Sequence, residues 1–317
     1  MHDITIGVVS TDHETSKLFK QAAEKMNLNI KLKEGILEEG VAQALKLERE
    51  GVDVIISRGI TGRKIKKRVS IPTVIIEITA FDILKALHAA KNMGSKIAFL
   101  GNSQDIGLEF AYITKILGID VQCYPYNNIE EMDRQVAQIM NSGVDVVVST
   151  GLCIFEITKK SGMNAILVKS GYEAISNSMK RAIELIQDIR RTQEFSQKFK
   201  SVLESTNDGI FILDRDKCIS FVNPAAERLL NIDANKILGQ EAGKINLGSF
   251  LMPVLENKTH EAVRKVGSKQ FLVNAMPIKV KNIEQGLVIM FQSIDKIQVL
   301  EQKLRRQLLE KRLIAHH

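Results

Sequence analysis

The chain has no tryptophan, only three cysteines and no long apolar run. The cysteines, Cys123, Cys153 and Cys218, stand far apart and form no C-x-x-C pair, so the sequence predicts neither a disulfide framework nor a zinc site. The longest apolar stretches, such as residues 144–148, fall far short of the roughly 18 residues that a membrane-spanning helix needs. The N-terminus also lacks the basic, apolar and small-residue order of a signal peptide. We therefore expect a cytoplasmic protein with reduced thiols and no membrane contact.

Sequence signatures of catalysis are missing as well. The chain contains no G-x-x-x-x-G-K-[ST], no G-x-G-x-x-G after a strand, no G-x-S-x-G and no H-E-x-x-H. Its histidines form no metal-ligand pattern. The sequence therefore predicts no catalytic residue, no metal site and no cofactor.

The composition is that of a folded protein with a clustered positive charge. The 317 residues are 44% hydrophobic and 26% charged, which favours two or three globular domains. The net charge is +7, and much of the surplus lies in two places, residues 58–68 and 303–312.

A duplication organises the first half of the chain. The segment GVDVIISRG at residues 51–59 returns as GVDVVVSTG at residues 143–151, a spacing of 92 residues. Lys67 and Lys159 stand at the same spacing, as do Ile83 and Ile175. Because such a match over a fixed offset is typical of internal repeats, we interpret residues 1–190 as a duplicated domain.

Each copy alternates short β-branched runs with segments of helical period, which is typical of a parallel sheet with helices on both faces. We expect two three-layer α/β lobes, about residues 1–80 and 94–171, that face each other across a cleft. A helix from about Ala80 to Met93 is expected to pass the chain between them. The expected strands are residues 4–9, 29–33, 52–57 and 73–78, then 96–100, 120–124, 144–149 and 164–168.

The carboxyl ends of these strands are the candidate binding site, because open parallel sheets bind ligands there, where helix N-termini and free backbone N–H groups converge. Small and hydroxyl-bearing residues at these ends let the backbone approach an anion, and Arg58 and Lys169 carry the counter-charge. Arg58 stands out, because its repeat counterpart is Thr150 and the fold demands no basic side chain there. We predict that a small anionic metabolite binds in the cleft. The candidate ligand-binding residues are Ser10, Thr11, Ser57, Arg58, Gly59, the nearby Thr61, Glu77, Gly101, Asn102, Ser149, Thr150, Gly151, Lys169, Ser170 and Gly171.

Other functions of the same two lobes were considered. A duplicated α/β pair with one cysteine in each lobe suggests an amino-acid racemase, with opposed thiols as acid and base. Cys153 does lie at a strand end, but its repeat counterpart is Thr61. A phosphoacceptor receiver domain is not supported, because Asp53 and Asp145 lie at strand starts. A stand-alone small-molecule-binding protein is the other alternative.

A long helix and a second domain follow the duplication. No proline or glycine interrupts residues 173–207, so we expect a connecting helix over residues 172–206, some thirty residues long and about 45 Å in extent. Residues 205–214 (STNDGIFILD) and 221–227 (FVNPAAE), followed by Gly239, resemble a PAS domain over residues 198–293. Apolar residues at three- and four-residue steps predict an amphipathic helix over residues 294–317 that is suited to pairing.

The duplicated domain resembles the N-terminal sensor of the propionate-catabolism activators, a branch of the sigma-54-dependent transcriptional activators. The resemblance depends on residues 56–59 (ISRG) with Thr61, on 70–72 (SIP), on 78–84 (ITAFDIL), and on Ser170 and Gly171. Two departures flank Arg58: Ile60 stands where the family often has glycine, and Pro72 is followed by residues 73–76 (TVII) instead of valine and an acid.

This resemblance implies a regulatory module that is not itself an enzyme and forms a homodimer through its PAS domain and linker helices. It implies a carboxylate effector such as 2-methylcitrate, and a relay from the closing lobes through the connecting helix and the PAS domain. It further implies an AAA+ ATPase that contacts sigma-54 RNA polymerase and a DNA-binding helix-turn-helix. Because neither stands before His317, we expect the chain to be the regulatory half of such an activator.

Overall fold

The computed structural model describes residues 4–102, 108–247, 250–251 and 262–294. The chain divides into two compact units, Met1–Arg191 and Thr192–His317. Within the described residues, no helix is both long enough and apolar enough to cross a membrane. The amphipathic helix expected over residues 294–317 lies, except for Ile294, outside the described residues.

The first unit holds two four-stranded parallel sheets with equivalent strand orders, β2-β1-β3-β4 and β6-β5-β7-β8. The duplicated α/β fold predicted from the sequence is confirmed, and the strand ends lie within two residues of the expected ones. The strands are β1 (Thr5–Ser10), β2 (Asn29–Glu34), β3 (Val54–Arg58), β4 (Thr73–Ile76), β5 (Ile97–Asn102), β6 (Val121–Tyr126), β7 (Val146–Ser149) and β8 (Asn164–Leu167).

Helices cover both faces of each sheet in equivalent places. In the first lobe, α1 and the first part of α8 cover one face, and α2 and α3 cover the other. In the second lobe, the corresponding faces carry α5 with α4, and α6 with α7. The helices are α1 (His13–Met26), α2 (Leu37–Arg49), α3 (Gly59–Lys66), α4 (Ala80–Lys91), α5 (Leu108–Leu117), α6 (Ile129–Met140), α7 (Leu152–Lys160) and α8 (Tyr172–Ser205).

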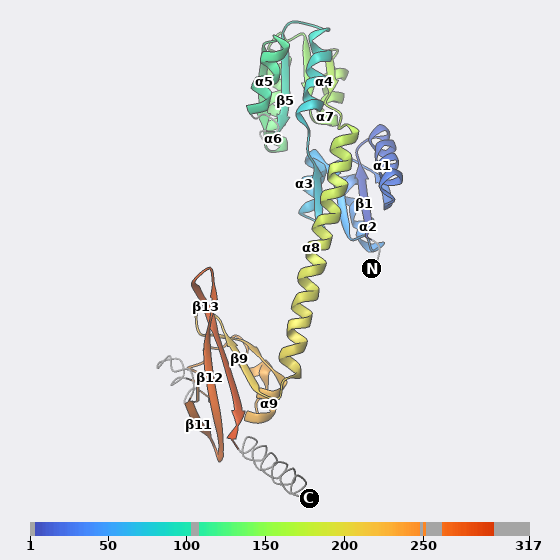
Figure 1. The fold of residues 1–317 in the computed structure, drawn as a ribbon. Helices are drawn as coiled ribbons and strands as arrows, with labels where there is room; N and C mark the ends of the chain where they lie inside the picture. The colour runs from blue at the N-terminus through green and yellow to red at the C-terminus, as the bar shows by residue number, and fades with distance from the viewer. Residues whose placement is uncertain (1–3, 103–107, 248–249, 252–261, 295–317) are drawn as a thin grey trace, which may run out of the picture. The chain divides into compact units, whose positions relative to one another are not determined.

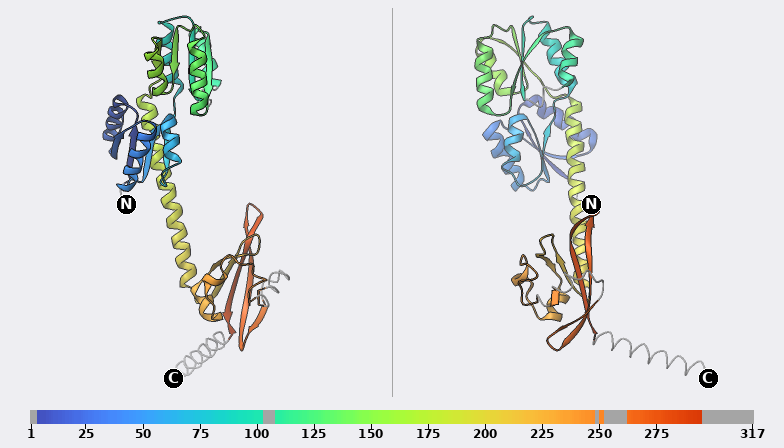
Figure 2. Two further views of the ribbon diagram at one scale, coloured as in Figure 1. Left: turned by 180° about the vertical axis from the view of Figure 1, so that it is seen from behind. Right: turned by 90° about the vertical axis from the view of Figure 1, so that its left-hand side faces the viewer.

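The two lobes exchange one helix each. Helix α4 follows β4 of the first sheet but packs on the second sheet, where Leu87 is fully buried beside Phe99 (Figure 1). Helix α8 follows β8 of the second sheet but packs on the first sheet, where Ile175 and Met179 are fully buried (Figure 2). The lobe ranges expected from the sequence assign neither helix to a lobe. In the structure, α4 completes the core of the second lobe and α8 completes that of the first.

A buried carboxylate joins the two segments that cross between the lobes. Asp82 in the first turn of α4 is only 3% exposed. It accepts a hydrogen bond from the backbone N–H of Thr79 at 3.1 Å and another from that of Gly171 at 3.0 Å. Thr79 and Gly171 belong to the two different crossings, so the Asp82 carboxylate holds the two crossings together.

Two arginines fasten α8 along the first sheet. Arg181 donates to the carbonyl of Ile75 at 2.8 Å and forms an ion pair with Glu77, just beyond the carboxyl end of β4. Arg190 forms an ion pair with Asp53 at 2.6 Å, just before β3 begins. The nine residue steps from Arg181 to Arg190 span about 13 Å of helix. Helix α8 is therefore held at both the carboxyl and the amino ends of the strands.

Equivalent aspartates accept backbone hydrogen bonds at the amino ends of the strands in both sheets. Asp53 accepts from the backbone N–H of Thr5 at 2.8 Å, and Asp145 accepts from that of Lys96 at 2.8 Å and that of Ser95 at 2.9 Å. These backbone hydrogen bonds, the one from Lys96 above all, lower the pKa of Asp145. Both side chains lie at the amino ends of the strands, opposite the carboxyl ends that were predicted to bind ligand.

The second unit has the predicted PAS fold, a five-stranded antiparallel sheet of order β10-β9-β13-β12-β11. Four phenylalanines, each at most 2% exposed, fill its core with ring centroids 5.3 to 6.0 Å apart. They are Phe211, Phe250, Phe271 and Phe291. The elements are β9 (Gly209–Leu213), β10 (Ile219–Val222), α9 (Pro224–Leu230), α10 (Ala234–Ile237), β11 (Ala262–Val266), β12 (Lys269–Val280) and β13 (Ile283–Ser293).

A buried asparagine ties the end of α8 to this sheet. Asn223 is inaccessible to solvent and caps α9 by accepting from the N–H of Ala226 at 2.9 Å. Its amide nitrogen donates to the carbonyls of Leu203 at 3.0 Å and Asp208 at 2.9 Å. It also accepts from the N–H of Ile210 at 2.8 Å. One side chain thus fixes the direction in which the chain leaves α8 and enters β9.

Candidate functional site

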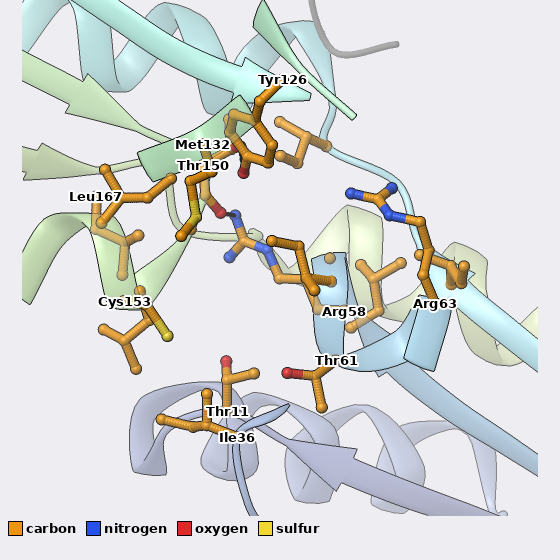
Figure 3. A pocket seen from close by; sticks show the side chains of 18 of the residues that line it. Thr11, Ile36, Arg58, Thr61, Arg63, Tyr126, Met132, Thr150, Cys153 and Leu167 are labelled. Carbon is orange, nitrogen blue, oxygen red and sulfur yellow. Dashed lines mark hydrogen bonds between the residues drawn. The ribbon is translucent and has the colours of Figure 1, made fainter. Parts of the chain in front are cut away.

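A cavity of about 480 Å³ lies between the two lobes of the first unit, at the carboxyl ends of their strands. Pockets that enclose a small molecule commonly have about 300–1,000 Å³. The first lobe contributes Thr11 and Thr61, whose hydroxyl groups point into the cavity, and the second lobe contributes Tyr126 and Thr150 (Figure 3). The structure therefore brings the strand ends of both lobes to one shared space.

Two helices related by the duplication begin at this cavity. Helix α3 starts at Gly59 and α7 starts at Leu152, and their N-cap residues, Arg58 and Gly151, line the cavity. Neither helix has a side-chain hydrogen bond at its cap or an acid in its first turn. Uncapped first-turn N–H groups, reinforced by the helix dipole, favour an anion. By contrast, α1, α4 and α6 are capped by their own Asp12, Thr79 and Asn128.

Arg58 crosses from the first lobe to the second. Its side chain is 93% buried, and one guanidinium nitrogen donates to the carbonyl of Val168 and, at 3.4 Å, to that of Thr150. Figure 3 shows the guanidinium reaching toward Thr150 across the upper part of the cavity. This arginine therefore joins the lobes directly, in addition to lining the space between them.

Arg63 and Glu77 are the other charged residues among the described wall. Arg63, in the second turn of α3, is half-buried and makes no hydrogen bond or ion pair with a described residue. Its guanidinium points from α3 toward the second lobe (Figure 3). Glu77 pairs with Arg181 of α8, so the charge of this carboxylate is already offset. Arg63 was not a predicted site residue, although the sequence places it in the basic cluster that begins at Arg58.

Much of the remaining wall is apolar. Ile36, Ile60, Ile75, Leu152 and Leu167 line the cavity and remain partly exposed, although they lie between two packed lobes. Sequence reasoning assigned no binding role to these residues, because an isoleucine or leucine near a strand end has the same appearance as a core residue.

The predicted site residues divide into two groups. Seven of them line the cavity: Thr11, Arg58, Gly59, Thr61, Glu77, Thr150 and Gly151. The others lie at the same strand ends but outside the described wall: Ser10, Ser57, Gly101, Asn102, Ser149, Lys169, Ser170 and Gly171.

Several residues of the second group have local structural contacts. The hydroxyl of Ser57 donates to the carbonyl of Val9 at 2.9 Å, and the amide of Asn102 donates to the carbonyl of Tyr126 at 3.0 Å. The amine of Lys169, which was expected to face an anion, forms an ion pair with Glu14.

Cys153 also lines the cavity, in the first turn of α7. Burial, with a smaller contribution from Glu156, raises the pKa of its thiol, so the neutral thiol predominates at pH 7. Within the described wall, the repeat counterpart Thr61 offers a hydroxyl and no second cysteine is present. Among the described residues, no group of three or more His, Cys, Asp or Glu side chains is arranged to hold a metal ion.

Two family models match the chain. The model described as "Propionate catabolism activator" matches residues 6–192, which is more than half of the chain. The model described as "PAS fold" matches residues 197–244. The first match covers both lobes and the cavity between them, and the second begins within α8 and covers the start of the antiparallel sheet.

Similar proteins of known structure or function are regulators and sensors. An NtrC family transcriptional regulator from Clostridium acetobutylicum is 26% identical with a TM-score of 0.53, and the match covers 59% of this chain and 98% of that one. Sensor protein CitS of Halalkalibacterium halodurans is 24% identical over 143 residues, which are 44% of this chain and 26% of that protein. The chain therefore spans about a quarter of the length of this curated relative. The PAS domain of an HTR-like protein from Haloarcula marismortui is 21% identical, with a TM-score of 0.27 and coverage of 34% of this chain and 98% of that one.

Proposed function

Because the chain belongs to the propionate catabolism activator family, we propose that its duplicated domain senses a small anionic metabolite, bound in the cavity between the lobes. The chain combines a sensor domain with a PAS domain, and its role is regulatory. The observation that carries the proposal is the pair of uncapped helix starts, α3 and α7, which face one cavity from opposite lobes. Bringing the lobes together around an anion would satisfy both helix starts at once.

A thermal-shift panel of small carboxylates and phosphate esters tests the proposed site. A ligand present at 100 times its dissociation constant stabilises the folded state by about 2.7 kcal/mol, which raises the melting temperature of a domain of this size by several degrees. The absence of tryptophan makes intrinsic fluorescence a poor substitute, so an external dye or calorimetry is preferable.

The matched variants place a fixed negative charge at two points of α7. Leu152→Asp puts a carboxylate at the first position of the helix, beside the cavity, where it competes with an anionic ligand. Ile157→Asp puts the same charge on an exposed residue of the same helix, away from the described cavity wall. We expect anions to stabilise the parent chain and Ile157→Asp but not Leu152→Asp. Equal stabilisation of both variants would contradict binding at the helix start.

We further propose that α8 carries the signal from the cavity toward the PAS domain. Glu77 lines the cavity and is paired with Arg181 of α8, so a ligand that moves this wall also acts on the helix. Asn223 holds the other end of α8 against the PAS sheet. Hydrogen exchange along α8 with and without ligand tests this relay, and an unchanged profile would count against it.

We propose that the output of the sensor is the activation of transcription. Membership of the family supports a sigma-54-dependent activator, in which an AAA+ ATPase and a DNA-binding domain receive the signal. Pairing of two copies is supported by Phe195, Phe199 and Val202, which are 71%, 53% and 61% exposed on one stripe of α8. Sedimentation of the parent chain and of a Phe195→Ser, Phe199→Ser double variant tests the pairing, and an unchanged sedimentation coefficient would contradict a role for this stripe.

A further inference from the structure

The charge and polarity of the cavity wall point to a narrower class of ligand. We infer that the cavity takes an amphipathic monocarboxylate, with its single anionic head at Arg63 and an apolar body against the aliphatic wall. This inference rests on the proposed function, because it assumes that the cavity is the effector site.

Among the described side chains of the wall, one basic group is available to an anionic ligand. Of the two described basic side chains on the wall, Arg58 directs its guanidinium at the backbone carbonyls of Val168 and Thr150. Arg63 has no such partner among the described residues, so its donors are available to a ligand. A tricarboxylate would therefore have one available arginine for three charges, and its other carboxylates would depend on the backbone N–H groups at the starts of α3 and α7, because burying an unpaired charge is costly.

The aliphatic residues of the wall supply a surface for an apolar body. Ile36, Ile75 and Leu167 come from both lobes and are partly exposed although they lie between packed elements. An apolar ligand would remove that surface from water, and each methylene buried in this way strengthens binding about fourfold. Such a surface gives no benefit to a small, fully charged metabolite.

The guanidinium of Arg63 and the aliphatic surface of the wall lie apart, as an amphipathic ligand requires. Figure 3 places Arg63 on one side of the cavity and Leu167 on the other, with Ile36 and Thr11 along the first-lobe wall between them. A phosphate monoester fits less well, because it carries nearly two charges at pH 7. A carboxylate binds an arginine through two parallel hydrogen bonds and carries one charge.

A titration series separates this class from its alternatives. Isothermal calorimetry on the full chain uses butyrate, pentanoate, hexanoate, the uncharged hexanamide, and citrate. We expect the affinity to rise about fourfold with each methylene from butyrate to hexanoate, and citrate to bind more weakly than hexanoate. We expect hexanamide to bind at least tenfold more weakly than hexanoate, because it cannot form the charge-assisted pair with Arg63.

Arg63→Gln locates the head group, and Arg68→Gln is the control, since Arg68 is exposed on the chain that follows the same helix, outside the described cavity wall. We expect Arg63→Gln to weaken hexanoate about tenfold and to leave hexanamide unchanged, while Arg68→Gln changes neither. Leu167→Ser is expected to abolish the gain from pentanoate to hexanoate. The chain-length series on the parent chain keeps the test decisive if that variant fails to fold.

The outcomes distinguish this inference from the proposed function. Tighter binding of citrate than of hexanoate, or an affinity that does not change with chain length, overturns the monocarboxylate and leaves the anion site standing. Equal affinities for hexanamide and hexanoate overturn both the monocarboxylate inference and the proposed anion site, because the cavity then does not distinguish a charged ligand from a neutral one. Absence of binding by every monocarboxylate, at concentrations where another anion of the thermal-shift panel does bind, overturns the inference alone.

Discussion

Replacing Arg58 by methionine tests whether this side chain holds the lobes together. Methionine keeps an unbranched stem of similar length but removes the donors to the carbonyls of Val168 and Thr150. A hydrogen bond from a charged donor contributes about 1.5–3 kcal/mol, and the 3.4 Å contact to Thr150 adds little because it is near the outer limit of hydrogen bonding. Arg58 is 93% buried, so part of this gain is offset by the cost of removing its guanidinium from water.

We therefore expect Arg58→Met to weaken the closed arrangement of the lobes by about 1.5–2.5 kcal/mol, which raises the population of separated lobes roughly 10- to 70-fold. Hydrogen exchange at the amide of Gly171 is the sensitive reporter, because this N–H donates to Asp82 across the two crossings. Its exchange should accelerate at least tenfold, while amides in the centre of β1 and β5 keep their rates. Arg68→Met is the control. An unchanged rate at Gly171, or a uniform acceleration over both sheets, would refute the idea that Arg58 acts as a tether.

Three further substitutions test the remaining features. Asp82→Ala removes the hydrogen bonds that its carboxylate accepts from the N–H groups of Thr79 and Gly171. It should lower the free energy of unfolding of the first unit by about 2–4 kcal/mol in urea titrations. A loss no larger than that caused by the exposed Asp120→Ala would contradict this. Asn223→Ala should cost the PAS unit a similar amount and release the end of α8, seen as faster exchange near Leu203, and Asn223→Asp should not rescue it because a carboxylate cannot donate. The native pKa of Asp145 lies below its unfolded value, so its carboxylate stabilises the fold above about pH 4, and this contribution is lost as the pH falls through the native pKa. Asp145→Asn should therefore flatten the acid side of the stability curve, and a slope identical to that of the parent chain would contradict the assignment.

The strands of the fold were predicted well from the sequence. The sequence did not predict on which sheet the helices α4 and α8 pack. Strands were recognisable because short β-branched runs alternate with helical periods and return after 92 residues. Periodicity shows that α4 and α8 each bury a face, but not against which sheet. The strand β6 was expected to end at Tyr124, before Pro125. Because β6 is an edge strand, it tolerates a proline and continues to Tyr126, which reaches the cavity.

The candidate site was predictable where the chemistry depends on strand ends. Thr11 and Thr150 follow strands, Arg58 is the last residue of one, and all three line the cavity as the rule for parallel sheets predicts. Arg63 did not follow from that rule, because it lies one turn into a helix and its long side chain reaches back to the space between the lobes. Whether an isoleucine such as Ile75 faces a core or a cavity depends on how closely two lobes approach, which no local pattern records.

The exchange of α4 and α8 has a consequence for biosynthesis. The first sheet is complete once β4 has left the ribosome, but one of its faces is covered only in part, by α1, until α8 is made, about a hundred residues later. At about 5–20 residues per second, the apolar face formed by Ile6, Val8 and Ile56 waits on the order of ten seconds for α8 to complete its cover. The second sheet has no such delay, because α4 is made before it. The two copies of one duplicated lobe are therefore completed in the reverse of their order along the chain.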